Sequence, residues 1–210
     1  MDADVFRTWI TTAAGVIEEQ RDHLTQLDAA IGDADHGINL ARGFSAVVTA
    51  LETAAPATPG AVLTLTGSTL ISKVGGASGP LYGTAFRGAG KALGDTADVD
   101  LPGLAAALEA ALAGVQRLGA AREGDKTMVD ALAPATGAFS KAIAEGASDA
   151  DALTALAEAA QAGAVATISM QALKGRASYL GPRSVGHEDP GAASTALILA
   201  ALRDAALAGR

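Results

Sequence analysis

Apolar residues recur at helical spacing along almost the whole chain, and this periodicity limits the possible folds more than any other feature. In the first segment, for example, Phe6, Ile10 and Ile17 fall on one face of a helix. No segment shows the sustained alternation that predicts a strand. Only 3% of the 210 residues are aromatic and alanine is abundant, so the helices have small apolar surfaces that pack closely. The sequence therefore predicts an all-α protein.

We expect eight helices in a single domain that spans residues 1–210. Thr58 before Pro59, and Ser148 before Asp149, are typical of helix starts because their side chains accept hydrogen bonds from free backbone N–H groups. Short connections favour antiparallel neighbours, in a bundle or a closed ring. The expected helices cover about residues 3–24, a stretch from 38 onward, 59–74, 81–93, 101–118, 127–144, 150–173 and 191–208.

Four loops rich in glycine or charge stand out between these helices, at residues 28–37, 75–80, 119–126 and 174–191. They follow the first, third, fifth and seventh expected helices. If the helices alternate in direction, all four loops lie at the same end of the molecule. We therefore expect one composite ligand site at that end.

Charge and composition exclude several classes of protein. The formal net charge of -8 gives no general attraction to nucleic acid or to an anionic membrane. The absence of cysteine excludes disulfides, thiolate zinc sites and thiol catalysis. The first residues do not resemble a signal peptide, and Pro56 and Pro59 interrupt the uncharged stretch 53–72, which argues against a membrane span. We expect a cytoplasmic protein.

Three carboxylates lie close together in the first loop. Asp28, Asp33 and Asp35 repel one another unless a cation neutralises them. Oxygen ligands without cysteine favour Mg²⁺, Mn²⁺ or Ca²⁺ over zinc. An EF-hand that begins at Asp33 is excluded because Phe44 stands where its glutamate belongs. The alternative is that Asp33 or Asp35 only caps the next helix.

The second and third loops have features of an anion site, each with a structural alternative. Gly75, Gly76 and Gly79 precede a helix and form either a phosphate cradle or a tight turn. The third loop fails as a P-loop, because Asp125 separates the second glycine from Lys126. Lys126 then either meets an anion or belongs to a salt-bridged turn.

The fourth segment contains Lys174, Arg176 and Arg183 in an otherwise acidic chain. Arg176 beside Gly175 is suited to bidentate contact with phosphate oxygens. His187 is a base, a phosphate contact or a structural residue. A metal cluster, a glycine cradle and basic residues together suggest phosphate chemistry on a nucleotide, without naming the nucleotide, the acceptor or the direction of transfer.

Four motifs, in this order, resemble those of the nucleotide-binding L subunits of dihydroxyacetone kinases, and the resemblance covers essentially the whole chain. The motifs are GDADHGINLARGF at 32–44, GGASGPLYGT at 75–84, GDKTMVDALAPA at 124–135 and MQALKGRASYLGPRSVGHEDPGA at 170–192. The resemblance implies eight antiparallel helices in a closed up-and-down barrel, with ADP held across the loops at one end.

The resemblance also implies a set of ligand contacts. Asp28, Asp33 and Asp35 would hold two Mg²⁺ ions that bridge the phosphates of a tightly bound ADP. The implied nucleotide contacts are His36, Gly37, Ile38, Asn39, Ala77, Ser78, Gly119, Met128, Arg176, Asp189, Pro190 and Gly191. No catalytic residue is assigned, because the family's phosphohistidine belongs to a partner protein. The roles of Lys126, Arg183 and His187 stay open.

Chain length separates the two arrangements of this family. The ATP-dependent kinases usually carry a dihydroxyacetone-binding domain in the same chain, and 210 residues leave no room for one. The resemblance therefore implies the phosphotransferase-system type, in which a phosphohistidine-carrying M-type protein rephosphorylates ADP and a K subunit presents dihydroxyacetone. A homodimer stays open. The alternatives are an L-type subunit that uses free ATP for a ketose or another kinase, and a non-enzymatic helical module that binds magnesium and nucleotide.

Overall fold

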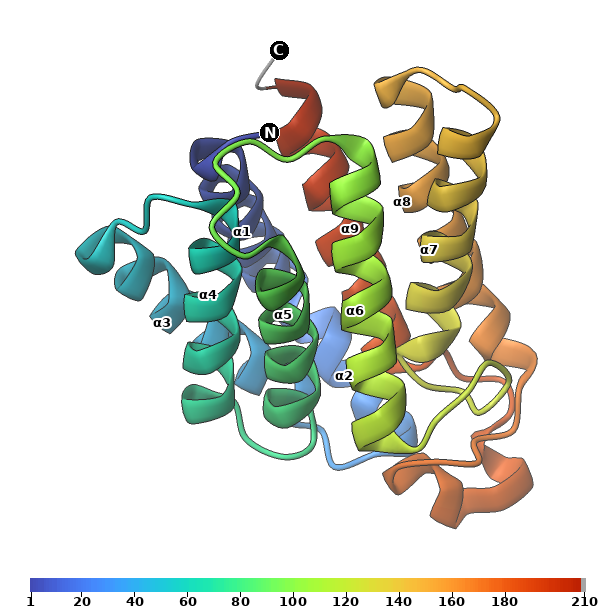
Figure 1. Cartoon of the computed structure of the whole chain (residues 1–210). Helices are drawn as coiled ribbons and strands as arrows, with labels where there is room; N and C mark the ends of the chain where they lie inside the picture. Colours follow the sequence, from blue (N-terminus) through green and yellow to red (C-terminus); the bar gives the residue numbers. More distant parts are fainter. Residues whose placement is uncertain (209–210) are drawn as a thin grey trace.

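The computed structural model describes residues 1–208, and their regular structure is entirely helical (Figure 1). This part of the chain contains nine α-helices and two 3₁₀ segments. They are α1 (Ala3–Glu19), α2 (Arg21–Ile31), α3 (His36–Ala54), α4 (Pro59–Lys73), α5 (Ser78–Leu93), α6 (Leu101–Gly119), α7 (Val129–Ala144), α8 (Asp149–Ala166), η1 (Thr167–Ser169), η2 (Arg176–Ser184) and α9 (Pro190–Ala208).

The predicted first helix, 3–24, and the count of eight helices are wrong for the described residues. The chain bends at Gln20, where φ is -92° and ψ is 7°, and α2 then continues to Ile31. The bend turns α2 so that it packs against α3 and α9. The approach of α3 is close: a Cβ atom on Gly37 would lie 2.0 Å from the carbonyl oxygen of Arg21. Asp28 consequently lies in the last turn of a helix rather than in a loop.

The predicted seventh helix, 150–173, is too long, because α8 ends at Ala166. The Thr167 side chain provides the physical reason. Its hydroxyl donates to the carbonyl oxygen of Ala164 at 2.6 Å and accepts the N–H of Asp189 at 2.9 Å, which ties the end of α8 to the chain just before α9. The segment 174–191, predicted to be irregular, contains η2, which is interrupted at Gly181.

Helices that follow one another in sequence mostly pack side by side. Each helix from α3 to α9 contacts the next one, α9 contacts α1, and α1 contacts α3. In Figure 1, α4, α5, α6, α7 and α8 run roughly parallel to one another, and α9 lies behind α6. By length and composition α9 could cross a membrane, but 56% of that apolar window is buried, as in the core helix of a folded domain.

Glycine allows α4 and α5 to approach until their backbones touch. A Cβ atom on Gly67 would lie 2.5 Å from the carbonyl oxygen of Gly83, and one on Gly83 would lie 2.7 Å from that of Gly67. The pair Gly60 and Gly90 repeats this contact about two helical turns away. A larger side chain at these positions would force the helices apart. The abundant small residues therefore set the spacing of this helix pair.

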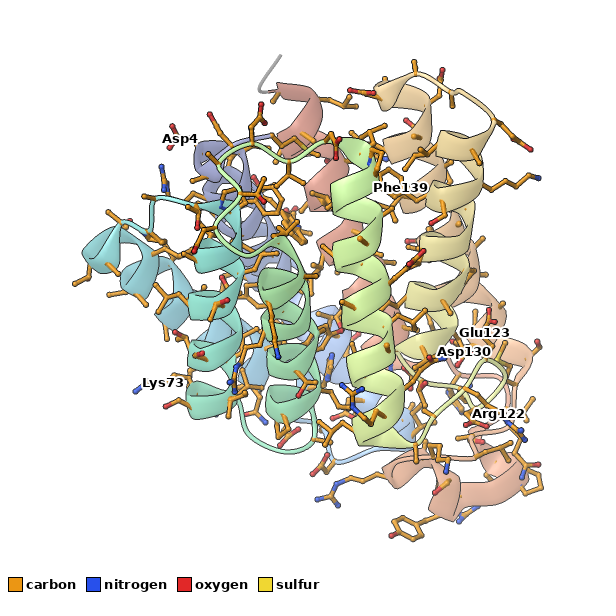
Figure 2. All side chains as sticks on the ribbon, in the orientation of Figure 1. Asp4, Lys73, Arg122, Glu123, Asp130 and Phe139 are labelled. Atoms are coloured by element: carbon orange, nitrogen blue, oxygen red, sulfur yellow. The ribbon has the colours of Figure 1, made fainter. Side chains whose placement is uncertain are left out.

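A few large side chains fill the remaining interior. Phe6, Trp9, Phe86 and Phe44 form a chain of ring contacts with centroids 5.7 to 6.3 Å apart, which joins α1, α5 and α3. The Trp9 indole N–H also donates to the carbonyl oxygen of Ile198 on α9 at 2.9 Å. Phe139 on α7 is fully buried beside α6, whereas Asp4 and Lys73 point outward at opposite ends of the molecule (Figure 2).

Candidate functional site

One pocket collects residues from all four of the predicted loops, at the end of the molecule opposite the N-terminus (Figure 1). Its volume is about 210 Å³. The prediction that these loops meet at one end is therefore confirmed. The predicted contact residues that line the pocket are Asp28, Asp33, Asp35, His36, Ala77, Ser78, Met128, Arg176, Asp189, Pro190 and Gly191.

Four other predicted contacts lie outside the lining of the pocket. Gly37 faces α2, Ile38 is 51% exposed, and Gly119 lies beside Leu81. Asn39 is buried, and its side-chain oxygen accepts a hydrogen bond from Arg42 at 2.8 Å. In this structure Gly37 has a packing role, because α2 leaves no room for a side chain there.

The three predicted metal ligands form a compact acidic cluster. Asp28, Asp33 and Asp35 each offer a carboxylate oxygen, and these oxygens lie within 4.8 Å of one another. Gly32 makes room for the cluster, because a Cβ atom there would lie 2.0 Å from Oδ1 of Asp28. Ala34 adopts a left-handed backbone with φ of 61°, a strained conformation that persists only where the surroundings hold it. The local backbone is thus shaped to bring the acids together.

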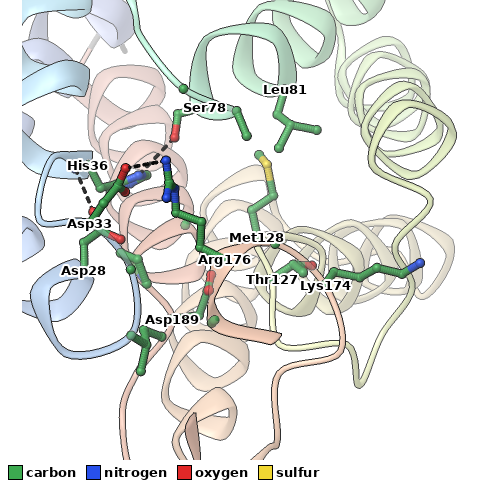
Figure 3. A pocket seen from close by; sticks show the side chains of 18 of the residues that line it. Asp28, Asp33, His36, Ser78, Leu81, Thr127, Met128, Lys174, Arg176 and Asp189 are labelled. Carbon is green, nitrogen blue, oxygen red and sulfur yellow. Dashed lines mark hydrogen bonds and ion pairs between the residues drawn. The ribbon is translucent and has the colours of Figure 1, made fainter. Parts of the chain in front are cut away.

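The donor set of this cluster fits a hard divalent cation. All of its ligand atoms are carboxylate oxygens, which Mg²⁺ and Ca²⁺ prefer. Oδ2 of Asp28 also accepts the N–H groups of Asp35 at 2.9 Å and His36 at 3.1 Å, so this carboxylate is held in place by the backbone. Among residues 1–208, one basic group forms an ion pair with the cluster: Arg176 lies 2.9 Å from Asp33 (Figure 3).

Four helices begin at the pocket. The starts of α3, α5, α7 and α9 lie at His36, Ser78, Val129 and Pro190, and these residues or their immediate neighbours line it. Helix N-termini carry partial positive charge and unsatisfied N–H groups, so they attract anions. The first N–H groups of α5 have no side-chain cap in the described chain. The pocket thus combines an anion-attracting floor with an acidic wall.

His36 joins three of the helices that meet here. Its Nδ1 lies 3.1 Å from Oγ of Ser78 on α5, and its Nε2 lies 2.8 Å from Oγ of Ser194 on α9. Burial lowers the pKa of His36 below its usual value, although the nearby carboxylates of Asp28 and Asp35 oppose this shift. The ring is therefore neutral at physiological pH, with both nitrogens engaged in hydrogen bonds.

Comparison with known proteins adds a second line of evidence to this geometry. A family model described as the DAK2 domain matches residues 30–204. The chain belongs to the DAK2 domain family. It is 42% identical over 201 residues to the PEP-dependent dihydroxyacetone kinase 1, ADP-binding subunit DhaL, of Listeria innocua, and the match covers 96% of each chain. The corresponding PEP-dependent subunit of Escherichia coli K12 is 43% identical over 198 residues, with 94% of each chain covered.

A solved structure resembles this DAK2 domain as well. The dihydroxyacetone kinase of C. freundii, in complex with AMP-PNP and Mg²⁺, matches with a TM-score of 0.73 at 28% identity. The match covers 97% of this chain and 34% of that one, so the DAK2 domain corresponds to about a third of the larger kinase.

The DAK2 domain also contains pocket residues that sequence reasoning missed. Tyr82 is buried, and its hydroxyl lies 3.0 Å from the carbonyl oxygen of Gly191, 2.7 Å from Oγ of Ser194 and 2.9 Å from Oγ1 of Thr195. Burial raises the pKa of Tyr82 to about 12, so the phenol stays protonated. The only signal in the sequence was its place in the GGASGPLYGT motif, which gives no hint of its partners on α9.

The loop before α7 is held by its own carboxylates. Asp130 accepts the N–H groups of Gly124 at 2.5 Å and Thr127 at 2.7 Å, and Asp125 accepts that of Arg122 at 2.9 Å. Lys126 makes no hydrogen bond with Asp125; it is buried and donates to carbonyl oxygens elsewhere. The sequence left open a salt-bridged turn at Lys126. In the structure, the ion pair of this turn is a 4.0 Å contact between Arg122 and Asp125.

Asp189 caps α9 beside the pocket. Its Oδ2 accepts the N–H of Ala192 at 2.8 Å. Burial raises the pKa of Asp189 to about 7, while the Ala192 hydrogen bond and the nearby Lys126 ammonium oppose the shift. Near neutral pH this carboxyl group is therefore only partly ionised, and it adds less negative charge to the pocket than the cluster of Asp28, Asp33 and Asp35.

Proposed function

We propose that this chain is the ADP-binding subunit of a PEP-dependent dihydroxyacetone kinase, in which bound ADP is phosphorylated and its new phosphoryl group is passed to dihydroxyacetone. The relatives with this activity match the chain over nearly its entire length. We also propose that residues 1–210 act as a single cytoplasmic domain, and that the packing of α9 against α1 closes the helices into an up-and-down ring with the site at one end.

The coexistence of two opposed charge patterns in one pocket carries the proposal. Four helix N-termini favour a polyanion, whereas Asp28, Asp33 and Asp35 repel one. A nucleoside diphosphate bridged to the carboxylates by divalent cations satisfies both patterns. Neither a free anion nor a metal ion alone does so.

The proposed roles follow from the positions of the side chains. Asp28, Asp33 and Asp35 would hold two Mg²⁺ ions, which when bound neutralise phosphate charge and align the transferring group. Ser78 and the uncapped start of α5 would donate to phosphate oxygens. Arg176, whose guanidinium lies beside Asp33, would complete the charge balance (Figure 3).

The other end of the nucleotide needs an apolar contact, and the pocket provides one. Leu81 and Met128 point toward one another on the wall away from the acidic cluster, where a nucleobase would lie (Figure 3). Four predicted contacts do not line the pocket: Gly37, Ile38, Asn39 and Gly119. In this proposal they are neighbours of the residues that line it.

This chain offers binding and orientation rather than a covalent intermediate. Both ring nitrogens of His36 are engaged, so the histidine in the pocket is unsuited to carry a phosphoryl group. We propose that the phosphoryl donor is a phosphohistidine on a separate protein and that dihydroxyacetone is held by a K subunit. Phosphoryl transfer is compatible with this division because it depends mainly on positioning and charge neutralisation.

A second candidate is direct use of ATP. The C. freundii kinase was solved with AMP-PNP, an ATP analogue, and it matches 97% of this chain. The two candidates differ in whether the nucleotide stays bound between turnovers.

Binding of ADP tests the shared part of both candidates. Calorimetry with ADP and Mg²⁺ should show a tight complex that Asp33→Asn weakens and that Asp95→Asn, an exposed carboxylate beyond α5, leaves unchanged. Wild-type protein that binds neither ADP nor ATP in the presence of Mg²⁺ would refute the proposal.

The donor is tested by turnover. The assay contains a K subunit, dihydroxyacetone and a phosphohistidine relay supplied with phosphoenolpyruvate. The proposed subunit should then support many turnovers with only the ADP that it holds bound. Turnover on free ATP with rapid exchange of labelled nucleotide would favour the second candidate.

A further inference from the structure

Lys126 is buried in the loop between α6 and α7, with only 1% of its surface exposed. Its backbone is left-handed, with φ of 60°, which is uncommon for a residue with a side chain. Lysine is almost never fully buried unless its ammonium group has polar partners. The partners of Lys126 therefore indicate what the residue does.

The Lys126 ammonium bridges two places that lie twenty residues apart in the chain. Its Nζ donates to the carbonyl oxygen of Thr167 at 2.6 Å and to that of His187. The same junction contains two further bonds, from the N–H of Asp189 to Oγ1 of Thr167 at 2.9 Å and from the N–H of Gly186 to the carbonyl oxygen of Ile168 at 2.7 Å. We call Lys126, Thr167 and His187 the lysine clamp.

The segment that the lysine clamp closes is the one that forms a wall of the pocket. Residues 168–186 leave the helical body after α8, pass through η2 and return just before α9. They carry Arg176, which reaches across the pocket to Asp33 (Figure 3). Leu173 is fixed to the same loop as Lys126, because its N–H donates to the carbonyl oxygen of Asp125 at 3.0 Å.

Burial and nearby carboxylates act in opposite directions on the Lys126 ammonium group. Burial lowers the pKa of Lys126, and the carboxylates of Asp189, Asp130 and Glu188 oppose this shift. A protonated amine has three N–H donors and no acceptor, so it can bind both carbonyl oxygens at once, which a hydrocarbon side chain cannot do. Loss of the amine would remove a donor from the partly buried carbonyl oxygen of His187 and one of two donors from that of Thr167, which also accepts the N–H of Met170 at 3.1 Å.

We propose that Lys126 is a positioning residue for the nucleotide pocket: it clamps the base of segment 168–186 and so holds Arg176 and the Asp189–Gly191 turn against the ligand. This inference rests on the proposed binding of ADP for its functional consequence. The mechanical part, that the clamp orders the segment, is independent of any nucleotide.

The first experiment measures the clamp without ligand. In Lys126→Met, amide hydrogen exchange at Gly186 and Asp189 should become at least about tenfold faster, because the bonds at the junction open more often. Exchange in α4, which lies away from the clamp, should be unchanged. Unchanged exchange at Gly186 and Asp189 would overturn the inference.

The second experiment separates the clamp from the metal cluster. Lys126→Met should weaken ADP binding by at least about tenfold, because both the Arg176 segment and the α9 turn lose their support. Mn²⁺ binding without nucleotide, followed by electron paramagnetic resonance, should not weaken, since the acidic cluster belongs to the α2–α3 region. A residue needed only for folding would weaken both equally, and that result would overturn the assignment.

Three further variants serve as controls for Lys126→Met. Lys141→Met removes an exposed lysine on α7 and should affect neither measurement. If Lys126→Met does not fold, Thr167→Val removes the hydroxyl that accepts the Asp189 N–H, and Thr167→Ser keeps it. Faster exchange and weaker ADP binding in Thr167→Val but not in Thr167→Ser support the clamp; equal behaviour overturns it. If wild-type protein fails to bind ADP, the proposed function fails while the exchange experiment still tests the clamp.

Discussion

The ion pair between Arg176 and Asp33 predicts an unusual gain of metal affinity when the arginine is removed. The Arg176 guanidinium lies 2.9 Å from a carboxylate oxygen of Asp33, on one face of the acidic cluster. A metal ion that takes Asp33 as a ligand must first break this pair. Arg176→Gln should therefore bind Mn²⁺ more tightly than the wild type does.

The size of the gain follows from the exposure of the pair. The side chain of Arg176 is 70% exposed and that of Asp33 is 39% exposed, so solvent screens their attraction. Exposed pairs contribute about 0.2–1 kcal/mol, which corresponds to an increase in Mn²⁺ affinity of up to about fivefold. The same variant should bind ADP with Mg²⁺ roughly tenfold or more weakly, because a charge-assisted contact to phosphate is worth about 1.5–3 kcal/mol.

The assay is titration of Mn²⁺ by electron paramagnetic resonance, first without nucleotide and then with ADP. Lys174→Gln is the matched control, because Lys174 also lines the pocket but points away from the cluster (Figure 3). It removes the same charge without breaking the pair. Equal Mn²⁺ affinities in the two variants would show that only net charge matters, and weaker Mn²⁺ binding in Arg176→Gln would refute the reasoning altogether.

Three further predictions concern stability. Tyr82→Phe should lower the free energy of unfolding in urea by about 1.5 kcal/mol, because the hydroxyl ties α5 to α9; no change would mean that water replaces it. Gly67→Ala should cost about 1–3 kcal/mol by forcing α4 from α5, whereas Gly137→Ala, in open space on α7, should stabilise by about 0.5–1 kcal/mol. Burial raises the pKa of Asp189 from 3.8 to about 7, so its contribution is present below pH 4 and is lost as the pH rises toward 7. The stability of Asp189→Asn should therefore lack this decline, and parallel pH profiles for the two proteins would contradict it.

The helical class and most helix boundaries were predictable because each depends on local signals. Thr58 before Pro59 starts α4, and Ser148 starts α8, in both cases with the side-chain oxygen accepting a backbone N–H as expected. The break at Gln20 was missed because no glycine or proline marks it. The bend places α2 against α3 at Gly37, a tertiary contact that spacing along the chain does not reveal.

In the candidate site, too, local features were predictable from the sequence and tertiary contacts were not. The acidic cluster was predictable because Asp28, Asp33 and Asp35 are neighbours in sequence, and carboxylates at such density need a cation. The roles of Tyr82 and Lys126 were not, since their partners on α9 and at the end of α8 are far away in sequence. The position of a residue within a motif shows that it belongs to the site. Its hydrogen-bond partners decide whether it binds the ligand or holds other residues in place.

The four helix starts at the pocket explain how an acidic protein can attract a polyanion. A formal net charge of -8 repels nucleotides at long range, and the acidic cluster repels them at short range. The partial positive charge at the starts of α3, α5, α7 and α9 acts only near the pocket, because the effect of a helix end fades within a turn. Selectivity for metal-bound nucleotide then follows from the arrangement: free nucleotide meets the carboxylates unneutralised, whereas the metal complex presents cations to the acids and phosphate oxygens to the helix ends.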